Sequence, residues 1–214
     1  MALLKKPGKL VIISGFSGVG KGTVVQQLIG NADHYALSVS MTTRQPRENE
    51  EHGVHYYFVK DEVFEDMIEK NGFLEHAGYV GNYYGTPKAY VDRKLEEGFD
   101  VILEIEIQGA LNIKKKVPEA ILIYMLPPSA KTLKERLTGR GTETEEVILK
   151  RMKRAAEEAA GVEQYDYIIV NEDADECAQE LNCLIRAQRL RASSNMSFIR
   201  KIQRDLKELT KEGD

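Results

Sequence analysis

Residues 15–23 constrain this chain more than any other stretch. They read Gly-Phe-Ser-Gly-Val-Gly-Lys-Gly-Thr, follow the apolar run at residues 10–13 and precede a second apolar run at residues 24–29. These flanks predict a buried strand and the first turns of a helix. Glycines in the connection allow successive backbone N–H groups to point into one concavity, and the helix N-terminus adds partial positive charge. The sequence therefore predicts a phosphate-binding loop between a strand and a helix.

The spacing of the glycines before Lys21 is that of a P-loop, whose lysine reaches the β- and γ-phosphates of a bound nucleotide. There is one departure, because Gly22 stands where Ser or Thr usually follows the lysine, and Thr23 comes one residue late. The missing hydroxyl usually ligates Mg²⁺. We therefore expect Mg²⁺ to be held by phosphates, water and other side chains. A glycine-rich turn without a ligand is the alternative, and the flanking strand and helix argue against it.

Composition limits the remaining possibilities. The chain has 214 residues, of which 42% are hydrophobic, which suits one α/β domain with insertions or a core with a small subdomain. A net charge of −4 argues against long nucleic acid as a partner. No apolar run approaches the ~20 residues that span a membrane, and residues 1–9 lack the apolar region of a signal peptide. Cys177 and Cys183 lie ~9 Å apart on a predicted helix, too far for a disulfide, so we expect free thiols and a cytoplasmic location.

Strand and helix patterns alternate along the chain. Strand patterns occupy residues 36–40, 100–107, 120–126 and 165–170, with helical patterns between them. This alternation predicts an α/β fold with a parallel, doubly wound sheet and ligands at the carboxyl ends of its strands. A strand pattern at residues 54–59 and a helix with Asp61 as its N-cap belong to a small mixed insertion.

Apolar residues at helical spacing past residue 192 predict a final amphipathic helix. Its packing on the domain and its packing against a second copy, which would make a homodimer, are both open.

Several segments, in order, resemble the guanylate kinase family. They are residues 38–47, 53, 56–59, 73–75, 81–86, 105–109, 136–141 and 167–171, within a match from about residue 8 to about 191. The resemblance implies a P-loop kinase core at residues 1–39 and 87–192, a GMP-binding subdomain at about 40–86 and a helical lid at about 137–158. Residues 193–214 form a helical extension beyond it. The implied reaction transfers a phosphoryl group from ATP to GMP and yields ADP and GDP.

The resemblance also implies the acceptor contacts. Two arginines three residues apart can both fork onto phosphate oxygens, and two tyrosines add phenolic donors. Guanine presents N1–H and its 2-amino group side by side, so one carboxylate can accept both, and Glu75 matches the family residue with this role. Glu106 stands where the family commonly has Asp. The implied GMP contacts are Ser40, Arg44, Arg47, Tyr56, Glu75, Tyr84, Thr86 and Glu106.

On the donor side, the resemblance implies an ATP site, a set of catalytic cations and a Mg²⁺ that accompanies ATP. The ATP contacts are Gly15, Ser17, Gly18, Val19, Gly20, Lys21, Gly22, Thr23, Arg136 and Asn171. The catalytic residues are Lys21, Arg44, Arg140 and Arg151. Glu104 and Glu106 are the candidates for the metal, through water. Positioning and electrostatics do most of the work in phosphoryl transfer, so no strong general base is needed.

Two other functions deserve comparison with this one. An inactive guanylate-kinase-like module that binds phosphopeptides is disfavoured by the intact Lys21, Arg140 and Arg151. A kinase for another nucleoside monophosphate is suggested by Gly22 and Thr23, which resemble adenylate kinases, but Glu75 has no good role against adenine.

Overall fold

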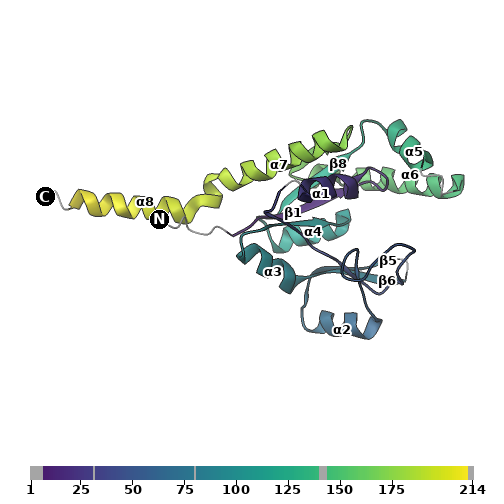
Figure 1. Ribbon diagram of the computed structural model, residues 1–214, viewed down its shortest axis with the longest axis horizontal. Helices are drawn as coiled ribbons and strands as arrows, with labels where there is room; N and C mark the ends of the chain where they lie inside the picture. Colours follow the sequence, from purple (N-terminus) through teal and green to yellow (C-terminus); the bar gives the residue numbers. More distant parts are fainter. Residues whose placement is uncertain (1–6, 31, 80, 140–143, 212–214) are drawn as a thin grey trace.

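The computed structural model describes residues 7–30, 32–79, 81–139 and 144–211. These residues form two sheets. The larger has five strands in the order β2-β7-β1-β8-β9, and the smaller has four in the order β4-β3-β6-β5. The larger sheet and its helices make the body of the molecule, and the smaller sheet lies to one side of that body (Figure 1).

The five-stranded sheet is parallel throughout. Its strands are β1 (Leu10–Gly15), β2 (Tyr35–Leu37), β7 (Asp100–Glu104), β8 (Ile121–Leu126) and β9 (Tyr167–Val170). The central strand β1 is buried on both sides, which explains its continuous apolar sequence. Because all five strands run the same way, their carboxyl ends meet at one edge of the sheet, where the loop after β1 lies.

Helices cover both faces of this sheet. One face packs on α1 (Lys21–Gly30) and α7 (Ala174–Leu190) through the cluster that holds Val11 and Ile13. The other face packs on four helices through the cluster that holds Leu10 and Ile12. Those helices are α3 (Lys88–Glu96), α4 (Ile107–Lys116), α5 (Ala130–Gly139) and α6 (Glu145–Ala159). Alternate residues of one strand thus serve opposite faces, and the predicted doubly wound α/β fold is confirmed.

The smaller sheet is mixed, and a short helix packs on it. It consists of β3 (Met41–Thr42), β4 (Tyr57–Phe58), β5 (Phe73–Tyr79) and β6 (Asn82–Pro87), with α2 (Asp61–Glu69) beside them. Phe64 of α2 is fully buried, and its ring centroid lies 4.4 Å from that of Phe73 and 5.3 Å from that of Tyr83. This aromatic stack joins the helix to its sheet, while Leu74 of β5 packs into the core of the body.

Several local predictions were wrong at their edges. The predicted strand at residues 36–40 ends at Leu37, and the one predicted from residue 165 begins at Tyr167. Only Tyr57–Phe58 of the predicted strand at residues 54–59 is a strand, because the chain before it turns and the Nδ1 atom of His55 accepts the Glu51 N–H at 3.0 Å. Asp61 is the first residue of α2 and not its cap. The predicted strand at 100–107 ends at Glu104, since the backbone at Glu106 already caps α4.

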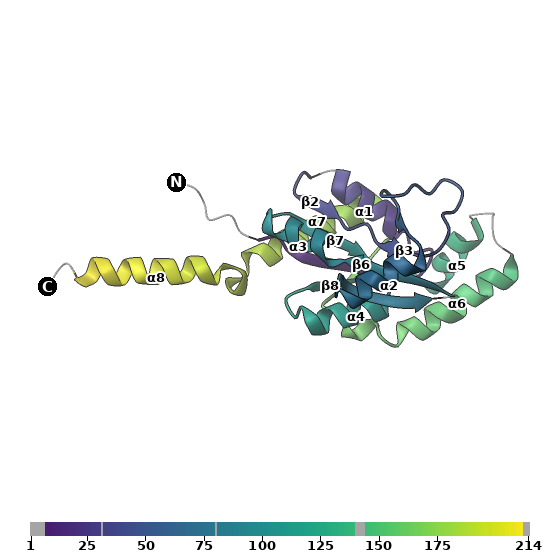
Figure 2. The same cartoon turned by 90° about the horizontal axis from the view of Figure 1, so that it is seen from below.

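The predicted final helix is present as α8 (Met196–Lys211), which follows the short turn η2 (Ala192–Asn195). It extends away from the body in both views (Figures 1 and 2). Its apolar side chains stay exposed, with Leu206 at 58% and Leu209 at 70%, so this stripe is not packed on the domain. Packing against a second copy stays a prediction. Within the described residues, no helix combines the length and the apolar character that a membrane span requires.

Candidate active site

The glycine-rich loop lies between the end of β1 and the start of α1. Gly18 and Gly20 have φ angles of +90° and +98°, which glycine adopts without the strain that a Cβ atom would cause. A Cβ at Gly18 would lie 2.6 Å from Leu137 Cδ2, and one at Gly20 would lie 2.6 Å from Asn171 Nδ2. Both glycines are therefore required by conformation and by space, and they give the loop the tight curvature of a phosphate cradle.

Lys21, the first residue of α1, folds back over this loop. Its Nζ atom donates to the carbonyl oxygen of Gly15 at 2.6 Å. It also lines a cavity of about 190 Å³, which we call the P-loop cavity. The lining residues are Gly15, Ser17, Lys21, Tyr56, Glu104, Ile105, Glu106, Ile107, Tyr124 and Glu158. The lysine thus places a positive charge beside backbone N–H groups of the loop, where a phosphate chain would need it.

A second cavity, of about 300 Å³, adjoins the first, and we call it the arginine cavity. It brings together seven residues that the sequence predicts for one site: Ser40, Arg44, Arg47, Tyr56, Glu75, Tyr84 and Glu106. Its other lining residues are Glu50, Ala77, Gly85, Glu104, Ile105, Gln108 and Gly109. The two cavities share Tyr56, Glu104, Ile105 and Glu106 as a common wall.

Arg44 is the most strongly held cation of the arginine cavity. It donates to both carboxylate oxygens of Glu50, from Nη1 at 2.9 Å and from Nη2 at 3.0 Å, and its guanidinium carbon lies 5.5 Å from the ring centroid of Tyr56. The hydrogen bond to Arg44 lowers the pKa of Glu50. Among the described residues, the buried Nε of Arg44 has no acceptor. The group is therefore preoriented and still has a donor available for an anion.

Glu75 lies at the buried end of the same cavity, with only 7% of its surface exposed. Its Oε1 atom accepts from Thr86 Oγ1 at 2.9 Å. Burial raises the pKa of Glu75 above its ordinary value, against the opposing effects of the Thr86 hydrogen bond and the charge of Lys116. A Cβ at Gly109 would lie 2.9 Å from Oε2, so the glycine gives the carboxylate its room. Thr86 is fully buried and orients Glu75 without lining the cavity.

Glu104 faces the start of α1 from the common wall. A Cβ at Gly22 would lie 3.9 Å from its Oε2 atom, so the carboxylate is close to where P-loops usually carry a hydroxyl. Its side chain opens into the two cavities, and the walls displace enough bulk water to raise its pKa, while the charge of Lys21 acts in the opposite direction. Among the described residues, no three His, Cys, Asp or Glu side chains form a cluster that could hold a metal ion alone.

Helix α6 lines the P-loop cavity through Glu158, and two of its arginines contact residues that line the cavities. Arg151 donates from Nη1 to the hydroxyl of Ser17 in the glycine-rich loop at 2.9 Å. Arg154 donates from Nη2 to Glu106 Oε2 at 2.7 Å and from Nε to Glu158 Oε1 at 2.8 Å. The structure therefore places Arg151 against the glycine-rich loop, and its catalytic role stays a prediction. The predicted Arg140 lies outside the described residues.

Two predicted ATP contacts lie behind the loop instead of in its cavity. The buried amide of Asn171 donates from Nδ2 to the carbonyl oxygen of Val19 at 2.8 Å. Arg136 donates to the same oxygen from Nη1 at 3.1 Å and to the Glu172 carbonyl oxygen at 3.2 Å. Neither residue lines the two cavities, so in this structure both brace the loop. Val19 itself is a core residue, and Thr23 is exposed on α1.

Sequence reasoning missed four residues that act on the site: Glu50, Gln108, Lys116 and Arg154. Gln108 had a signal, because it belongs to the predicted segment at residues 105–109. Glu50 stands among other acidic residues, and Arg154 among other basic residues of α6. Only the folded arrangement separates these two from their neighbours.

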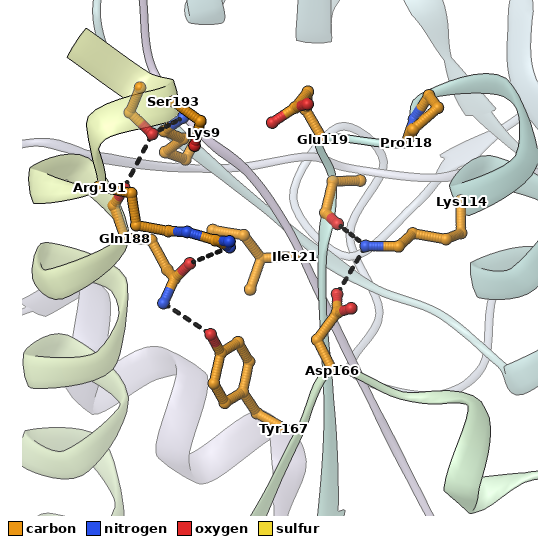
Figure 3. A pocket seen from close by; sticks show the side chains of 12 residues that line it. Lys9, Lys114, Pro118, Glu119, Ile121, Asp166, Tyr167, Gln188, Arg191 and Ser193 are labelled. Carbon is orange, nitrogen blue, oxygen red and sulfur yellow. Dashed lines mark hydrogen bonds and ion pairs between the residues drawn. The ribbon is translucent and has the colours of Figure 1, made fainter.

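A further cavity, of about 210 Å³, lies at the opposite edge of the sheet, beside the first residues of β8 and β9 (Figure 3). It holds none of the predicted site residues. Lys9 donates there from Nζ to Ser194 Oγ at 2.8 Å, and Lys114 donates to Asp166 Oδ2 at 2.7 Å. Lys114 joins α4 to the residue before β9, and Lys9 joins the chain before β1 to η2, so the arrangement is that of a structural junction.

Comparisons with known proteins point to one family. The family model described as guanylate kinase matches residues 7–188. The guanylate kinase of Caldanaerobacter subterraneus subsp. tengcongensis is 46% identical over 202 residues, which cover 94% of this chain and 98% of the relative. That of Prochlorococcus marinus is 49% identical over 183 residues, which cover 86% and 100%.

A solved structure gives the same result. The crystal structure of guanylate kinase from Anaplasma phagocytophilum matches with a TM-score of 0.72 at 32% identity, over 88% of this chain and 90% of that one. Sequence motifs, fold and the pair of adjoining cavities all point the same way. This chain belongs to the guanylate kinase family.

Proposed function

We infer that this protein is an ATP-dependent guanylate kinase, which transfers the γ-phosphoryl group of ATP to GMP and releases ADP and GDP. One observation connects this reaction to particular residues. The cavity at the glycine-rich loop and the cavity that holds Arg44 and Glu75 share a wall, so a donor in one and an acceptor in the other would meet there. In direct transfer the phosphoryl group passes from ATP to GMP without being attached to the protein, so the two substrates must lie next to each other.

The acceptor phosphate is assigned to Arg44 and Arg47, with the hydroxyls of Tyr56 and Tyr84. All four line the arginine cavity. Arg44 is oriented by Glu50 and offers a buried Nε donor that no described group accepts. Charge-assisted hydrogen bonds of this kind are about twice as strong as neutral ones, so they would fix the attacking phosphate oxygen toward the common wall.

The guanine base is assigned to the inner end of that cavity. Glu75 in its ionised form accepts the N1–H and 2-amino donors together, while Thr86 holds its other lone pairs in place. Ser40 and Glu106 line the same space and complete the predicted base contacts. A buried carboxylate that meets adenine would have no donor at these positions, and an unpaired buried charge is costly. The mixed sheet at residues 41–87 therefore acts as the GMP-binding subdomain in this proposal.

The ATP phosphates are assigned to the glycine-rich loop and Lys21, which faces the P-loop cavity. Arg151 already contacts Ser17, so α6 delivers a second cation to the same place and acts as part of the lid. Positive charge over the transferring group stabilises the negative charge that spreads over its oxygens in the transition state. The expectation for Arg140 is the same, on sequence grounds alone. Arg136 and Asn171 act by holding the loop backbone through Val19.

The surroundings of Gly22 suit a Mg²⁺ ion that is bound together with ATP. Glu104 Oε2 lies close to the position of the missing hydroxyl, and a carboxylate oxygen is a suitable ligand for the metal or for its water. Bound there, Mg²⁺ would neutralise phosphate charge and orient the γ-phosphoryl group. Glu104 would hold it from the common wall, and Lys21 would balance the charge of the carboxylate.

The experiment for the assignment is ADP release from ATP and Mg²⁺ with GMP, AMP, CMP and UMP as separate acceptors. We expect GMP to be preferred over each of the others by about 10⁴-fold in kcat/KM, because a site built for a donor pair rejects bases that lack it. Lys21→Ala is the matched control for coupled-assay background, since it removes the charge at the β- and γ-phosphates. Release of ADP with no acceptor preference would contradict the assignment.

A further inference from the structure

Arg154 of α6 makes a contact that the proposed reaction does not account for. Its Nη2 atom donates to Glu106 Oε2 at 2.7 Å, across 48 residues of sequence, and its Nε atom donates to Glu158 Oε1 at 2.8 Å. Glu106 belongs to the common wall between the two cavities, and Glu158 lines the P-loop cavity. One guanidinium group therefore bridges the lid helix and the wall where donor and acceptor would meet.

The surroundings make this bridge electrostatically significant. The two cavities contain several carboxylates, and the charge of Glu106 contributes to the raised pKa of the buried Glu75. GMP and ATP are themselves anions, so a further unpaired carboxylate on the common wall would repel them. Arg154 of α6 places a positive charge beside the Glu106 carboxylate. The pair is partly exposed, with side chains 35% and 62% accessible, so its effect on folding stability is small.

The bridge also fixes where the lid helix lies. Arg151 is one turn before Arg154 on α6 and contacts Ser17 of the glycine-rich loop at 2.9 Å. Two contacts one turn apart on a helix restrain both its distance from the core and its rotation about its own axis. The contact at Glu106 therefore helps to keep the guanidinium group of Arg151 directed at the loop.

We propose that Arg154 is a positioning residue for phosphoryl transfer, which acts by pairing with Glu106 and thereby holds α6 in place, with Arg151 over the glycine-rich loop. This inference rests on the proposed function, since it assigns a role within the same reaction. It differs from a purely structural role, because the effect of Arg154 depends on the partner at residue 106.

The test is a double-mutant cycle of Arg154→Met, Glu106→Gln and the two together, with GMP and ATP as substrates. We expect Arg154→Met to lower kcat about 5- to 10-fold in the parent and by less than about 2-fold in the Glu106→Gln background. The KM for ATP should change by less than about 2-fold, because the glycine-rich loop sets it. Arg154→Lys should restore most of kcat, since an ammonium group can still pair with one carboxylate.

Two further variants sharpen the comparison. Lys153→Met removes an exposed positive charge from the same turn of α6 and should leave kcat like that of the parent. Glu106→Asp keeps the charge and withdraws it by one methylene, so it should lose kcat as Arg154→Met does. Additive losses in the cycle, or an equal loss in Lys153→Met, would overturn the inference while GMP phosphorylation by the parent upholds the proposed function. A parent that does not phosphorylate GMP would overturn both.

Discussion

Arg189 donates to both carboxylate oxygens of Asp100, from Nη2 to Oδ1 at 2.8 Å and from Nε to Oδ2 at 2.8 Å. Asp100 opens β7 and is fully buried, and the Lys9 N–H donates to it at 2.6 Å. The pair joins the end of α7 to the start of a central strand. It therefore anchors the sheet at the edge opposite the site.

The first prediction concerns this pair. Arg189→Met should lower the free energy of unfolding by about 3 kcal/mol, because it leaves a buried carboxylate without its counter-ion. Urea unfolding followed by far-UV circular dichroism measures the change. Arg186→Met removes an exposed arginine from the same helix and should change it by less than about 0.5 kcal/mol. Equal effects of the two substitutions would show that the buried pair contributes no more to the free energy of unfolding than an exposed arginine does.

The second prediction concerns Arg151. Arg151→Ala should lower kcat on the order of 10³-fold, by analogy with arginine fingers, because its charge is used mainly in the transition state. The KM values for ATP and GMP should change far less. Ser17→Ala removes the hydroxyl that Arg151 contacts in this structure and should cost much less than the loss of the arginine. An unchanged kcat in Arg151→Ala would show that Arg151 is an ordinary surface residue without a role in catalysis.

The third prediction concerns the missing P-loop hydroxyl. Glu104→Gln should raise the Mg²⁺ concentration for half-maximal rate, because it removes the carboxylate beside Gly22. Gly22→Ser should lower that concentration, and its added Cβ would meet Glu104 Oε2 at an ordinary contact distance of 3.9 Å. Initial rates in a Mg²⁺ titration at fixed ATP compare the two variants. Identical titrations in parent and both variants would place the metal elsewhere.

The fourth prediction is a pH dependence. Burial raises the pKa of Glu75 above its ordinary value, and the ionised form is the one that accepts the guanine donors. The rate constant kcat/KM for GMP should therefore fall as the pH decreases through this raised pKa. Thr86→Val removes a hydrogen bond that lowers the pKa, so the acid limb should move to higher pH. Thr86→Ser keeps the hydroxyl and should retain the pH profile of the parent. An acid limb that does not move in Thr86→Val would show that the limb does not report the ionisation of Glu75.

The same shift has a consequence for stability. The folded-state pKa of Glu75 lies above the unfolded value, so the folded protein binds the proton more tightly. Ionised Glu75 therefore opposes folding at neutral pH, and this opposition is relieved as the pH falls through the folded pKa. Retaining such a residue at a cost in stability is typical of a binding site.

Much of the fold could be predicted from the sequence, because local signals carried it. Buried parallel strands such as β8 read as unbroken apolar runs, and the loop before Lys21 has a spacing that few other structures need. Asp173 caps α7 by accepting from two backbone N–H groups, and Asp is a common residue at this position. Strand ends were harder, because residues 54–56 have strand propensity but are held in a turn by His55.

The site was predictable as a set of residues but not as a set of contacts. Glu106 was expected at the base or at the metal, and nothing in the sequence joins it to Arg154, 48 residues away. The resemblance implies that Asn171 contacts ATP, and its amide instead donates to the Val19 carbonyl oxygen. Such pairings depend on the angle between α6 and the sheet and on the depth of the loop. Neither can be predicted from a single sequence by local patterns.

The fifth prediction concerns Glu75, whose carboxylate is proposed to read the guanine base. Glu75→Gln replaces one acceptor oxygen with an NH₂ group, which donates and cannot accept from the 2-amino group, and it removes the negative charge that strengthens both hydrogen bonds. The variant should therefore lose most of the advantage of GMP over AMP and keep the parent affinity for ATP. Gln108→Glu tests the opposite change at a neighbouring position in the same cavity and should not lower the KM for AMP.

The most direct measurement is kcat/KM for GMP and for AMP in the parent and in Glu75→Gln. We expect the parent to prefer GMP by about 10⁴-fold. The variant should lose GMP activity selectively, with its weak AMP activity nearly unchanged. Equal losses for both acceptors, or a parent that prefers AMP, would show that Glu75 does not read the base and would contradict the assignment of this site to GMP.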